Sequence, residues 1–438
     1  MANTFSFTNF VSKTLGTFLE NHSNVLSVSY RGVEEFNKAT GAGYAPGDTV
    51  DIKIPGYPTV QTGLAVTAED ITDRTVPYTL KEEDIYNVTY QIDIQSIGID
   101  VVGGELAFSG NPYRNPNNDK EINPQAKTLI DNYVFPAGEV INGKIETVIM
   151  DKLKAAAFYT PIDLPSKLQV INKYANVSGV RTLMNNLGFM NRRYAFMNEG
   201  DYEGVANSLQ NMFNEPINRN ITQTGAYGEK TLADFIFTAA NTISNTDESP
   251  QYAANPSSTG VTVSAISPDG STITLSGVIV TAGLVLNAGT LVAIPAVKLL
   301  NKVTKIALET TFVGVVAADA VGDNAGNVTF TLSEPVVAAG MQANVNILPA
   351  PADAALIFPA HRNNYFFVPM GVVANPVKLG RIAGADNNRY QNAAKNMDIT
   401  AYIQGLVTSG ANTFRMSCQC PTLAIPSYVV NLPSVIPS

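Results

Sequence analysis

GTLVAIPAVKLLNK, at residues 289–302, is a largely apolar run that begins at a glycine and ends beside an asparagine. Two runs of the same kind follow it, TFVGVVAAD at 311–319 and VTFTLSEP at 328–335. Short apolar runs that are separated by Gly, Pro, Asn and Asp favour strands over helices. We therefore predict a unit of about five to seven short strands, which is typical of a small closed barrel or a sandwich.

The borders of this unit are marked by changes in composition. Ser, Asn, Pro and Thr crowd together between 245 and 260, and Pro349 and Pro351 mark the other side. Such stretches favour loops. We predict an all-β domain at 245–352 that is inserted into a larger domain. Its predicted strands are 261–266, 272–275, 278–281, 290–294, 311–316 and 328–332.

Alternating runs before the insertion predict a long hairpin. Apolar and polar residues alternate from Thr49 to Ile54, and the alternation resumes from Val76 to Leu80. Period-two alternation is typical of a half-buried strand. Pro, Gly and a polar stretch separate the two runs, so we predict two strands that are joined by an extended tip. A third alternating run, from Val88 to Gln95, predicts a strand of the main sheet.

The start of the chain carries an apolar stripe with helical spacing. It predicts a short helix from about Thr8 to Asn21. The stripe either folds back on the chain's own core or forms an arm that docks on a neighbouring subunit. A buried Phe contributes about 1.5 to 3 kcal/mol, so the stripe needs a partner surface. Its members are Phe7, Phe10, Val11, Leu15, Phe18 and Leu19.

The remaining segments predict a mixture of helices and strands. Apolar residues at helical spacing from Val140 to Ala156 predict a helix of roughly 20 residues, which is about 30 Å long. Gly188 is placed to end a later helix. The predicted fold class is therefore α+β. Further helices are predicted at 171–187, 202–213 and 232–239, and strands at 193–197, 365–369 and 414–420.

Composition excludes several classes of protein. The chain has 438 residues and a net charge of -9, so the molecule as a whole repels a phosphate backbone. Two cysteines do not form a disulfide framework. The apolar runs are shorter than a membrane-spanning helix needs, and the first residues do not resemble a secretory signal. We expect synthesis in the cytosol and no membrane anchor.

The residue types that carry catalysis are scarce, because the chain has two His and two Cys. Cys418 and Cys420 have no second pair of ligands for zinc, and we predict that they are small buried residues. His22 and His361 are expected to be surface or capping residues. The acidic run at 82–84 is expected to be a solvated strand junction. We predict no catalytic, metal or cofactor-binding residue.

The order of these parts resembles the major capsid proteins of tailed bacteriophages, which have the Hong Kong 97-type fold. The three runs quoted first are similar to the inserted domain found in the short-tailed-phage branch. The ending FRMSCQC, at 414–420, and the proline-rich tail to Pro433 resemble the way such coats finish. One departure is the uncharged stretch from Gly277 to Gly289, because inserted domains of the family often bridge capsomers through charged loops.

The resemblance implies a division of the chain into named parts. The N-terminal arm would be 1–47 and the E-loop 48–80. The capsid core, with its P-domain, spine helix and A-domain, would be 81–244 and 353–438, and the inserted β-barrel domain would be 245–352. The implied protein is a shell subunit without enzymatic activity or cofactor.

The resemblance also implies partners and a place. The chain would form hexamers and pentamers of an icosahedral head around double-stranded DNA, which it would not bind by sequence. A scaffolding protein and a portal would assist, and assembly in the host bacterial cytoplasm would give the virion. The candidate residues of the subunit interface are Phe7, Phe10, Val11, Leu15, Phe18, Leu19, Ile54, Tyr57, Asp70 and Arg74.

Three alternatives remain at this point. An encapsulin-like compartment shell has the same general shape, although an inserted barrel is less expected there. A β-rich adhesin or tail protein would bind glycans or cells through the module at 261–348. A glycoside hydrolase would need two carboxylates in one cleft, for which Glu199 and Asp201 are the candidates.

Overall fold

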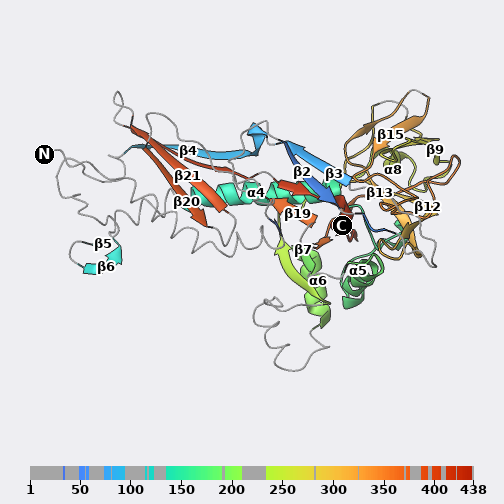
Figure 1. Cartoon of the computed structure of the whole chain (residues 1–438), viewed down its shortest axis with the longest axis horizontal. Coiled ribbons are helices and arrows are strands. Elements are labelled where there is room, and N and C mark those ends of the chain that lie inside the picture. The colour runs from blue at the N-terminus through green and yellow to red at the C-terminus, as the bar shows by residue number, and fades with distance from the viewer. Residues whose placement is uncertain are drawn as a thin grey trace, which may run out of the picture.

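The chain is a mixed α/β structure in the computed structural model (Figure 1). The predicted helix at the start of the chain, His22 and the hairpin tip with Asp70 lie outside the part that the structure describes. The described residues are 33–34, 49–54, 56–58, 74–79, 81–93, 114–115, 118–122, 135–189, 193–209, 233–280, 283–323, 325–368, 371–374, 386–392, 397–405, 411–420 and 422–436.

The long helix α4, Phe135–Ala156, confirms the helix predicted at 140–156. Its 22 residues span about 33 Å. Apolar side chains every fourth residue face the interior, because four residues are close to one turn. On the solvent face, Val140 is 60% exposed. The buried residues, each at most 1% exposed, are Ile141, Ile145, Ile149 and Leu153.

A four-stranded antiparallel sheet, in the order β20-β21-β22-β4, lies along α4 (Figure 1). It joins distant parts of the chain, since Tyr86 is paired with Cys418. Cys418 and Cys420 are both buried, as predicted. The strands are β4 (Ile85–Asp93), β20 (Asp386–Asn392), β21 (Met397–Gly405) and β22 (Ala411–Gln419), which confirms the strands predicted near 88 and 414.

A second four-stranded sheet has the order β24-β18-β7-β8. Its strands are β7 (Arg193–Asn198), β8 (Phe235–Ala240), β18 (Tyr365–Phe367) and β24 (Val429–Asn431). Two helices lie next to β7 in the chain, α5 (Tyr174–Asn186) and α6 (Glu199–Leu209). Gly188 has a φ of +89°, so it ends the α5 segment in the left-handed region as predicted.

The helix predicted at 232–239 is wrong, because this segment forms the strand β8. β8 pairs with β7 in parallel, and Phe235, Ile236 and Phe237 are all buried. A strand that is covered on both faces is a continuous apolar run without alternation. Such a run is difficult to distinguish from a buried helix by period alone.

Strands dominate the segment from 261 to 332. They form a sheet β15-β10-β9, a pair β11-β14 and a sheet β13-β12-β16. The strand predicted at 278–281 is absent: the backbone N–H groups of Ile279 and Val280 donate to the side-chain oxygen of Gln251 instead of a neighbouring strand. The elements are α8 (Pro250–Ala254), β9 (Thr262–Ile266), β10 (Thr272–Ser276), β11 (Leu284–Leu286), β12 (Leu291–Leu300), β13 (Ala307–Val315), β14 (Ala320–Val321), β15 (Asn327–Thr331) and β16 (Leu356–Ile357).

Several short pairs complete the described structure. The predicted hairpin is present as β2 (Thr49–Ile54) and β3 (Arg74–Thr79), with Thr49 opposite Thr79. The other short strands are β1 (Val33–Glu34), β5 (Arg114–Asn115), β6 (Asn118–Ile122), β17 (His361–Arg362), β19 (Val372–Ala374), β23 (Thr422–Ala424) and β25 (Ser434–Val435). Short 3-10 helices lie at η2 (Glu82–Asp84), η5 (Pro165–Lys167) and η8 (Pro426–Tyr428).

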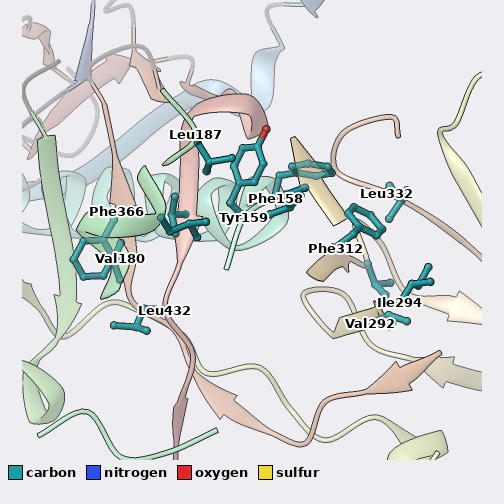
Figure 2. Packing of buried hydrophobic residues seen from close by; sticks show 14 of the residues in the cluster. Phe158, Tyr159, Val180, Leu187, Val292, Ile294, Phe312, Leu332, Phe366 and Leu432 are labelled. Carbon is teal, nitrogen blue, oxygen red and sulfur yellow. The ribbon is translucent and has the colours of Figure 1, made fainter. Parts of the chain in front are cut away.

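The strand-rich segment shares one core with the rest of the described chain (Figure 2). Phe158 and Tyr159 follow α4 directly, and their rings meet edge to face at 4.8 Å between centroids. Phe158 also lies 5.7 Å from Phe312 on β13. All three side chains are at most 1% exposed. The end of α4 therefore packs directly on the strand-rich segment.

This shared core predicts the effect of Phe312→Ala. The change leaves a cavity beside Phe158, so we expect the free energy of unfolding to fall by about 3–5 kcal/mol. Denaturant unfolding that is followed by circular dichroism measures it. Val321→Ala is the control, because Val321 is 64% exposed and should change stability by less than about 0.5 kcal/mol. Equal effects of the two changes would contradict the shared core.

Candidate functional site

The candidate interface residues of the hairpin contact the chain's own interior in this structure. Ile54, at the end of β2, is 3% exposed and belongs to the main core. The backbone N–H of Tyr57 donates to the carbonyl of Met341 over 3.3 Å. Arg74, at the start of β3, forms an ion pair of 3.1 Å with Glu334. The loop end of the paired strands is therefore attached to the segment that follows β15, and its role between subunits stays a prediction.

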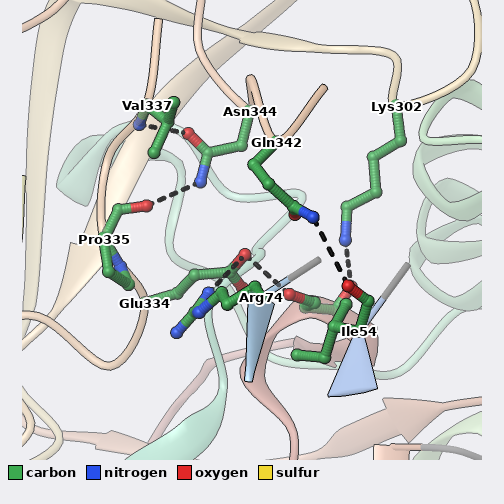
Figure 3. A network of polar contacts seen from close by, with 9 residues as sticks. Ile54, Arg74, Lys302, Glu334, Pro335, Val337, Gln342 and Asn344 are labelled. Carbon is green, nitrogen blue, oxygen red and sulfur yellow. Dashed lines mark hydrogen bonds and ion pairs between the residues drawn. The ribbon is translucent and has the colours of Figure 1, made fainter. Parts of the chain in front are cut away.

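We call this attachment the hairpin junction, and Figure 3 shows it. It consists of Ile54, Arg74, Lys302, Glu334, Gln342 and Ser427. The side-chain amide of Gln342 donates to the carbonyl of Ile54 over 3.4 Å. The Ser427 hydroxyl donates to Oε1 of Glu334 over 2.6 Å, the same oxygen that pairs with Arg74. One carboxylate thus ties the hairpin to the C-terminal turn η8.

The loop that carries Glu334 is organised by one buried amide. Asn344 is 2% exposed, and its side chain donates to the carbonyl of Pro335 over 2.8 Å. Its side-chain oxygen accepts the N–H of Val337 over 2.8 Å (Figure 3). A buried side-chain amide that forms hydrogen bonds with backbone groups can hold a loop in place where no helix or strand does. These two bonds therefore help to hold the loop that carries Glu334.

Lys302 lies at the end of the stretch quoted first, in a cage of aromatic rings. Its ammonium lies 5.3 Å from the ring centre of Tyr159, 5.2 Å from that of Phe189 and 5.1 Å from that of Tyr428. It donates to the backbone carbonyl of Ser427 over 2.6 Å. Ring faces attract cations, most strongly where water is excluded. The cage holds a half-buried cation at the place where α4, η8 and the strand-rich segment meet.

Burial changes the acid–base properties of this cluster. Desolvation lowers the pKa of Lys302 to about 8, and the negative charge of Glu334 opposes that effect. Desolvation raises the pKa of Tyr159 well above its usual range and that of Tyr428 to about 12. Glu334 itself is 5% exposed, and its Oε2 has no hydrogen-bond partner among the described residues. The charged groups of this cluster can therefore hold the hairpin, η8 and the strand-rich segment together. Within the cluster, no nucleophile is paired with a base.

The sequence did not point to Lys302 or Glu334. A lysine beside an apolar strand and a glutamate before a proline are ordinary surface patterns. Their significance comes from the contacts with Arg74 and Ser427, which are distant in the chain. A weak signal was available, since Lys302 directly follows a run that is almost free of charge.

The carboxylates named for a hydrolase are not arranged as a pair in one cleft. Glu199 is exposed, whereas Asp201 is 2% exposed. Asp201 accepts hydrogen bonds from the Asn364 amide, at 2.8 Å, and from the Ser434 hydroxyl, and Arg362 lies 3.7 Å away. Asp201 therefore joins α6 to β25 as a structural contact.

His361 is buried at 0% exposure, so the expectation of a surface histidine is wrong. It lies in β17, and its Nδ1 is 2.9 Å from the carbonyl of Pro359, to which it donates as the neutral tautomer. Burial lowers the pKa of His361 to about 4. Within the acidic run, Glu82 and Glu83 are exposed, as expected. Asp84 is buried instead, and it accepts the N–H of Lys81 over 3.0 Å.

The described residues contain neither a metal-binding cluster nor a membrane-spanning helix. No group of three or more His, Cys, Asp or Glu side chains in this part of the chain is placed to hold a metal ion. Among the helices of the described segments, none is both long and apolar enough to cross a membrane.

The chain is similar to three solved phage structures at low sequence identity. A chain of Mycobacterium phage Che8 has a TM-score of 0.39 and 10% identity, with 92% of this chain and 90% of that chain covered. The mature capsid of bacteriophage PhiM1 has a TM-score of 0.37 and 8% identity, with coverage of 93% and 87%. The capsid of Ralstonia phage GP4 has a TM-score of 0.41 and 5% identity, with coverage of 94% and 89%. No protein-family model and no curated protein matches the sequence.

The buried position of Glu334 predicts the effect of Glu334→Gln. The change leaves the Arg74 and Lys302 cations without their carboxylate, so we expect the free energy of unfolding to fall by about 3 kcal/mol. Chemical denaturation measures it. The matched control is Glu309→Gln on the exposed side of β13, which should be nearly neutral. Near-neutral behaviour of both variants would show that the junction contributes little to stability.

The burial of His361 predicts an acid-sensitive contribution to stability. The unfolded chain takes up the histidine proton near pH 6.5, whereas the pKa in the folded chain is about 4. The unfolded state therefore binds more protons in this window, and stability is lost as pH falls from about 6.5 to about 4. We expect His361→Gln to lose less stability over that range than the unchanged chain. An identical acid dependence of the two proteins, measured by denaturation at each pH, would rule this out.

Proposed function

We propose that the chain is the major capsid protein of a tailed bacteriophage and assembles into an icosahedral head around double-stranded DNA. It acts as a structural subunit of the virion, it has no enzymatic activity, and it needs no cofactor. Assembly takes place in the bacterial cytoplasm, with a scaffolding protein and a portal as partners. The fold is of the Hong Kong 97 type, in the short-tailed-phage branch, with a β-barrel domain inserted at 245–352.

The observation that carries this proposal is the order of the elements along the chain. The hairpin β2–β3 comes first, then the sheet strand β4 and the long helix α4. A mixed region of α5, β7, α6 and β8 follows, then the strand-rich segment β9 to β15, and finally the closing strands β18 to β25. This is the order of E-loop, spine helix, A-domain, insertion and return that the sequence resemblance implies.

The anchored loop end of the hairpin strands supports an extended role for the loop beyond it. β2 and β3 pair along their whole lengths, and Ile54 and Arg74 attach the ends near 55 and 73 to the chain's own interior. A loop of residues 55–73 connects these two fixed points. Fixing both ends of this loop lowers the entropic cost of ordering its distal part, which favours binding of that part to another subunit. We assign the contact with a neighbouring copy to Asp70 and to the side chain of Tyr57, whose backbone N–H donates to Met341 of its own chain.

The apolar stripe of the N-terminal arm supplies the second contact between copies. A shell subunit uses heterologous contacts that close on themselves. Many modest contacts per subunit give a stable shell through multivalency, without one dominant interface. The stripe residues Phe7, Phe10, Val11, Leu15, Phe18 and Leu19 fit this role because they are apolar and share one helical face.

The charge of the chain fits a container for DNA. A net charge of -9 keeps the subunit from gripping the phosphate backbone along its whole surface. Tight wrapping would oppose the release of the genome. The subunit therefore encloses DNA without sequence-specific binding.

The test is electron microscopy of the purified full chain, alone and with its scaffolding partner. We expect shells, rings or tubes, because the arm and the hairpin loop are buried only between copies. A chain that lacks residues 1–21 is the comparison: it should stay soluble and folded by circular dichroism but should not close shells. Persistent monomers of the full chain under both conditions would contradict the function. Normal shells from the truncated chain would contradict the role of the arm.

A further inference from the structure

Large apolar side chains that stay exposed are concentrated on the strand-rich segment. Among the described residues there are nine of them, and seven lie between 279 and 348. Figure 1 shows this segment at one end of the described structure. Single exposed apolar residues are ordinary, whereas their concentration in one region marks an interaction surface. The seven are Ile279, Leu284, Val303, Ile306, Val321, Ile347 and Leu348.

The turn at 301–306, between β12 and β13, points its apolar side chains outward and its lysines inward. Val303 is 49% exposed and Ile306 is 65% exposed. The ammonium groups of Lys302 and Lys305 donate to backbone carbonyls of buried residues, over 2.6 Å and 2.7 Å. Water alone favours the opposite arrangement, because lysine side chains normally keep their charged ends in solvent. We call these six residues the apolar turn.

The apolar turn is held in shape by one asparagine. The side-chain oxygen of Asn301 accepts the N–H groups of Val303 and Thr304, each over 2.8 Å. Its side-chain amide donates to the carbonyl of Asn186, at the end of α5, over 2.6 Å. A surface that is already ordered loses less conformational entropy when it binds. The apolar turn is therefore preorganised for a contact.

A second apolar surface lies toward the other end of the β12–β13 ribbon. Leu284 on β11 is opposite Val321 on β14, and these side chains are 39% and 64% exposed. β14 continues from β13 along β15, through bridges at Val316 and Gly322, and so leads away from the apolar turn. The ten residues of β12 alone span at most about 33 Å. We call Leu284 and Val321 the apolar pair.

The charges beside the two surfaces are opposite in sign. The apolar turn contains Lys302 and Lys305 and no acidic residue. Val321 of the apolar pair is flanked by Asp319 and Asp323, which are both exposed. Opposite charges bring two surfaces together, and like charges disfavour the wrong pairings. Contact of the turn with the pair is therefore favoured over turn with turn or pair with pair.

We propose that the apolar turn of one copy of this chain binds the apolar pair of a second copy. The two surfaces differ, so the contact is heterologous and repeats from copy to copy into a ring where the rotation closes. The inference rests on the proposed function, because it assigns to the subunits of the shell a contact besides those of the N-terminal arm and the hairpin loop. It is one of several modest contacts that act together.

Cysteine cross-linking between two full-length chains tests the contact. A light chain carries Val303→Cys and an isotopically heavy chain carries Leu284→Cys. Cys418 and Cys420 are 0% exposed, so a short bismaleimide does not reach them. Equal amounts are mixed under assembly conditions and treated with the reagent. We expect light–heavy dimers from the mixture at about ten times the yield of dimers from either variant alone.

Charge reversal beside the probes separates the contact from chance proximity. Ile306→Asp, added to the light chain, places an acid against the acidic surroundings of the apolar pair and should lower the light–heavy yield about tenfold. Val321→Lys, added to the heavy chain, should then restore the yield. The matched control is Ser264→Lys, at an exposed position on β9, which should not restore it. All three positions are exposed, so circular dichroism should show every variant folded.

The outcomes distinguish this contact from the proposed function. Shells that form without light–heavy dimers overturn the contact and leave the function standing. Light–heavy dimers without shells, rings or tubes support the contact and contradict the function, and monomers without dimers contradict both. A yield that Ile306→Asp does not change, or that both lysine variants restore equally, shows that the apolar turn does not bind the apolar pair.

Discussion

The structure depends on one buried carboxylate, that of Glu334, at the point where three distant segments meet. Glu334 is 5% exposed and interacts with Arg74 of the hairpin and Ser427 of the C-terminal turn. A buried carboxylate without partners would cost several kcal/mol, so its position requires both segments to be in place. The contact therefore determines where the hairpin leaves the body of the chain. It contributes orientation more than stability, since a buried ion pair gains little over apolar residues of the same shape.

Apolar packing surrounds this contact. Phe158 and Tyr159 lie just after the end of the long helix, and they belong to the aromatic cluster that contains Phe312. The same Tyr159 ring lies beside the ammonium of Lys302. The helix, the strand-rich segment and the hairpin are consequently attached at one place.

Much of the fold could be predicted from the period of the apolar residues. The alternation of β2 and β3 and the four-residue spacing along α4 each predicted the correct type of element. The failures have a common physical cause. β8 is a continuous buried run that shows no alternation. Ile279 and Val280 are apolar, but their backbone N–H groups donate to the Gln251 side chain. Burial that is created by tertiary contacts leaves no periodic signal in the sequence.

The site was harder to predict than the fold for the same reason. Ile54 and Arg74 were chosen as contacts to another subunit, and the structure gives both of them contacts within the chain. Glu334, which links them to the rest, has no recognisable sequence pattern.

The central claim is that Ile54, Tyr57 and Arg74 hold the loop end of the hairpin strands on their own chain, while the distal part of the loop contacts a neighbour. Cross-linking of carboxylates to amines in a particle that is assembled from equal amounts of light and isotopically heavy chains tests it most directly. We expect the cross-links of Glu69 and Asp70 to join light with heavy chains. Cross-links of these residues that join only chains of the same isotope would contradict the account.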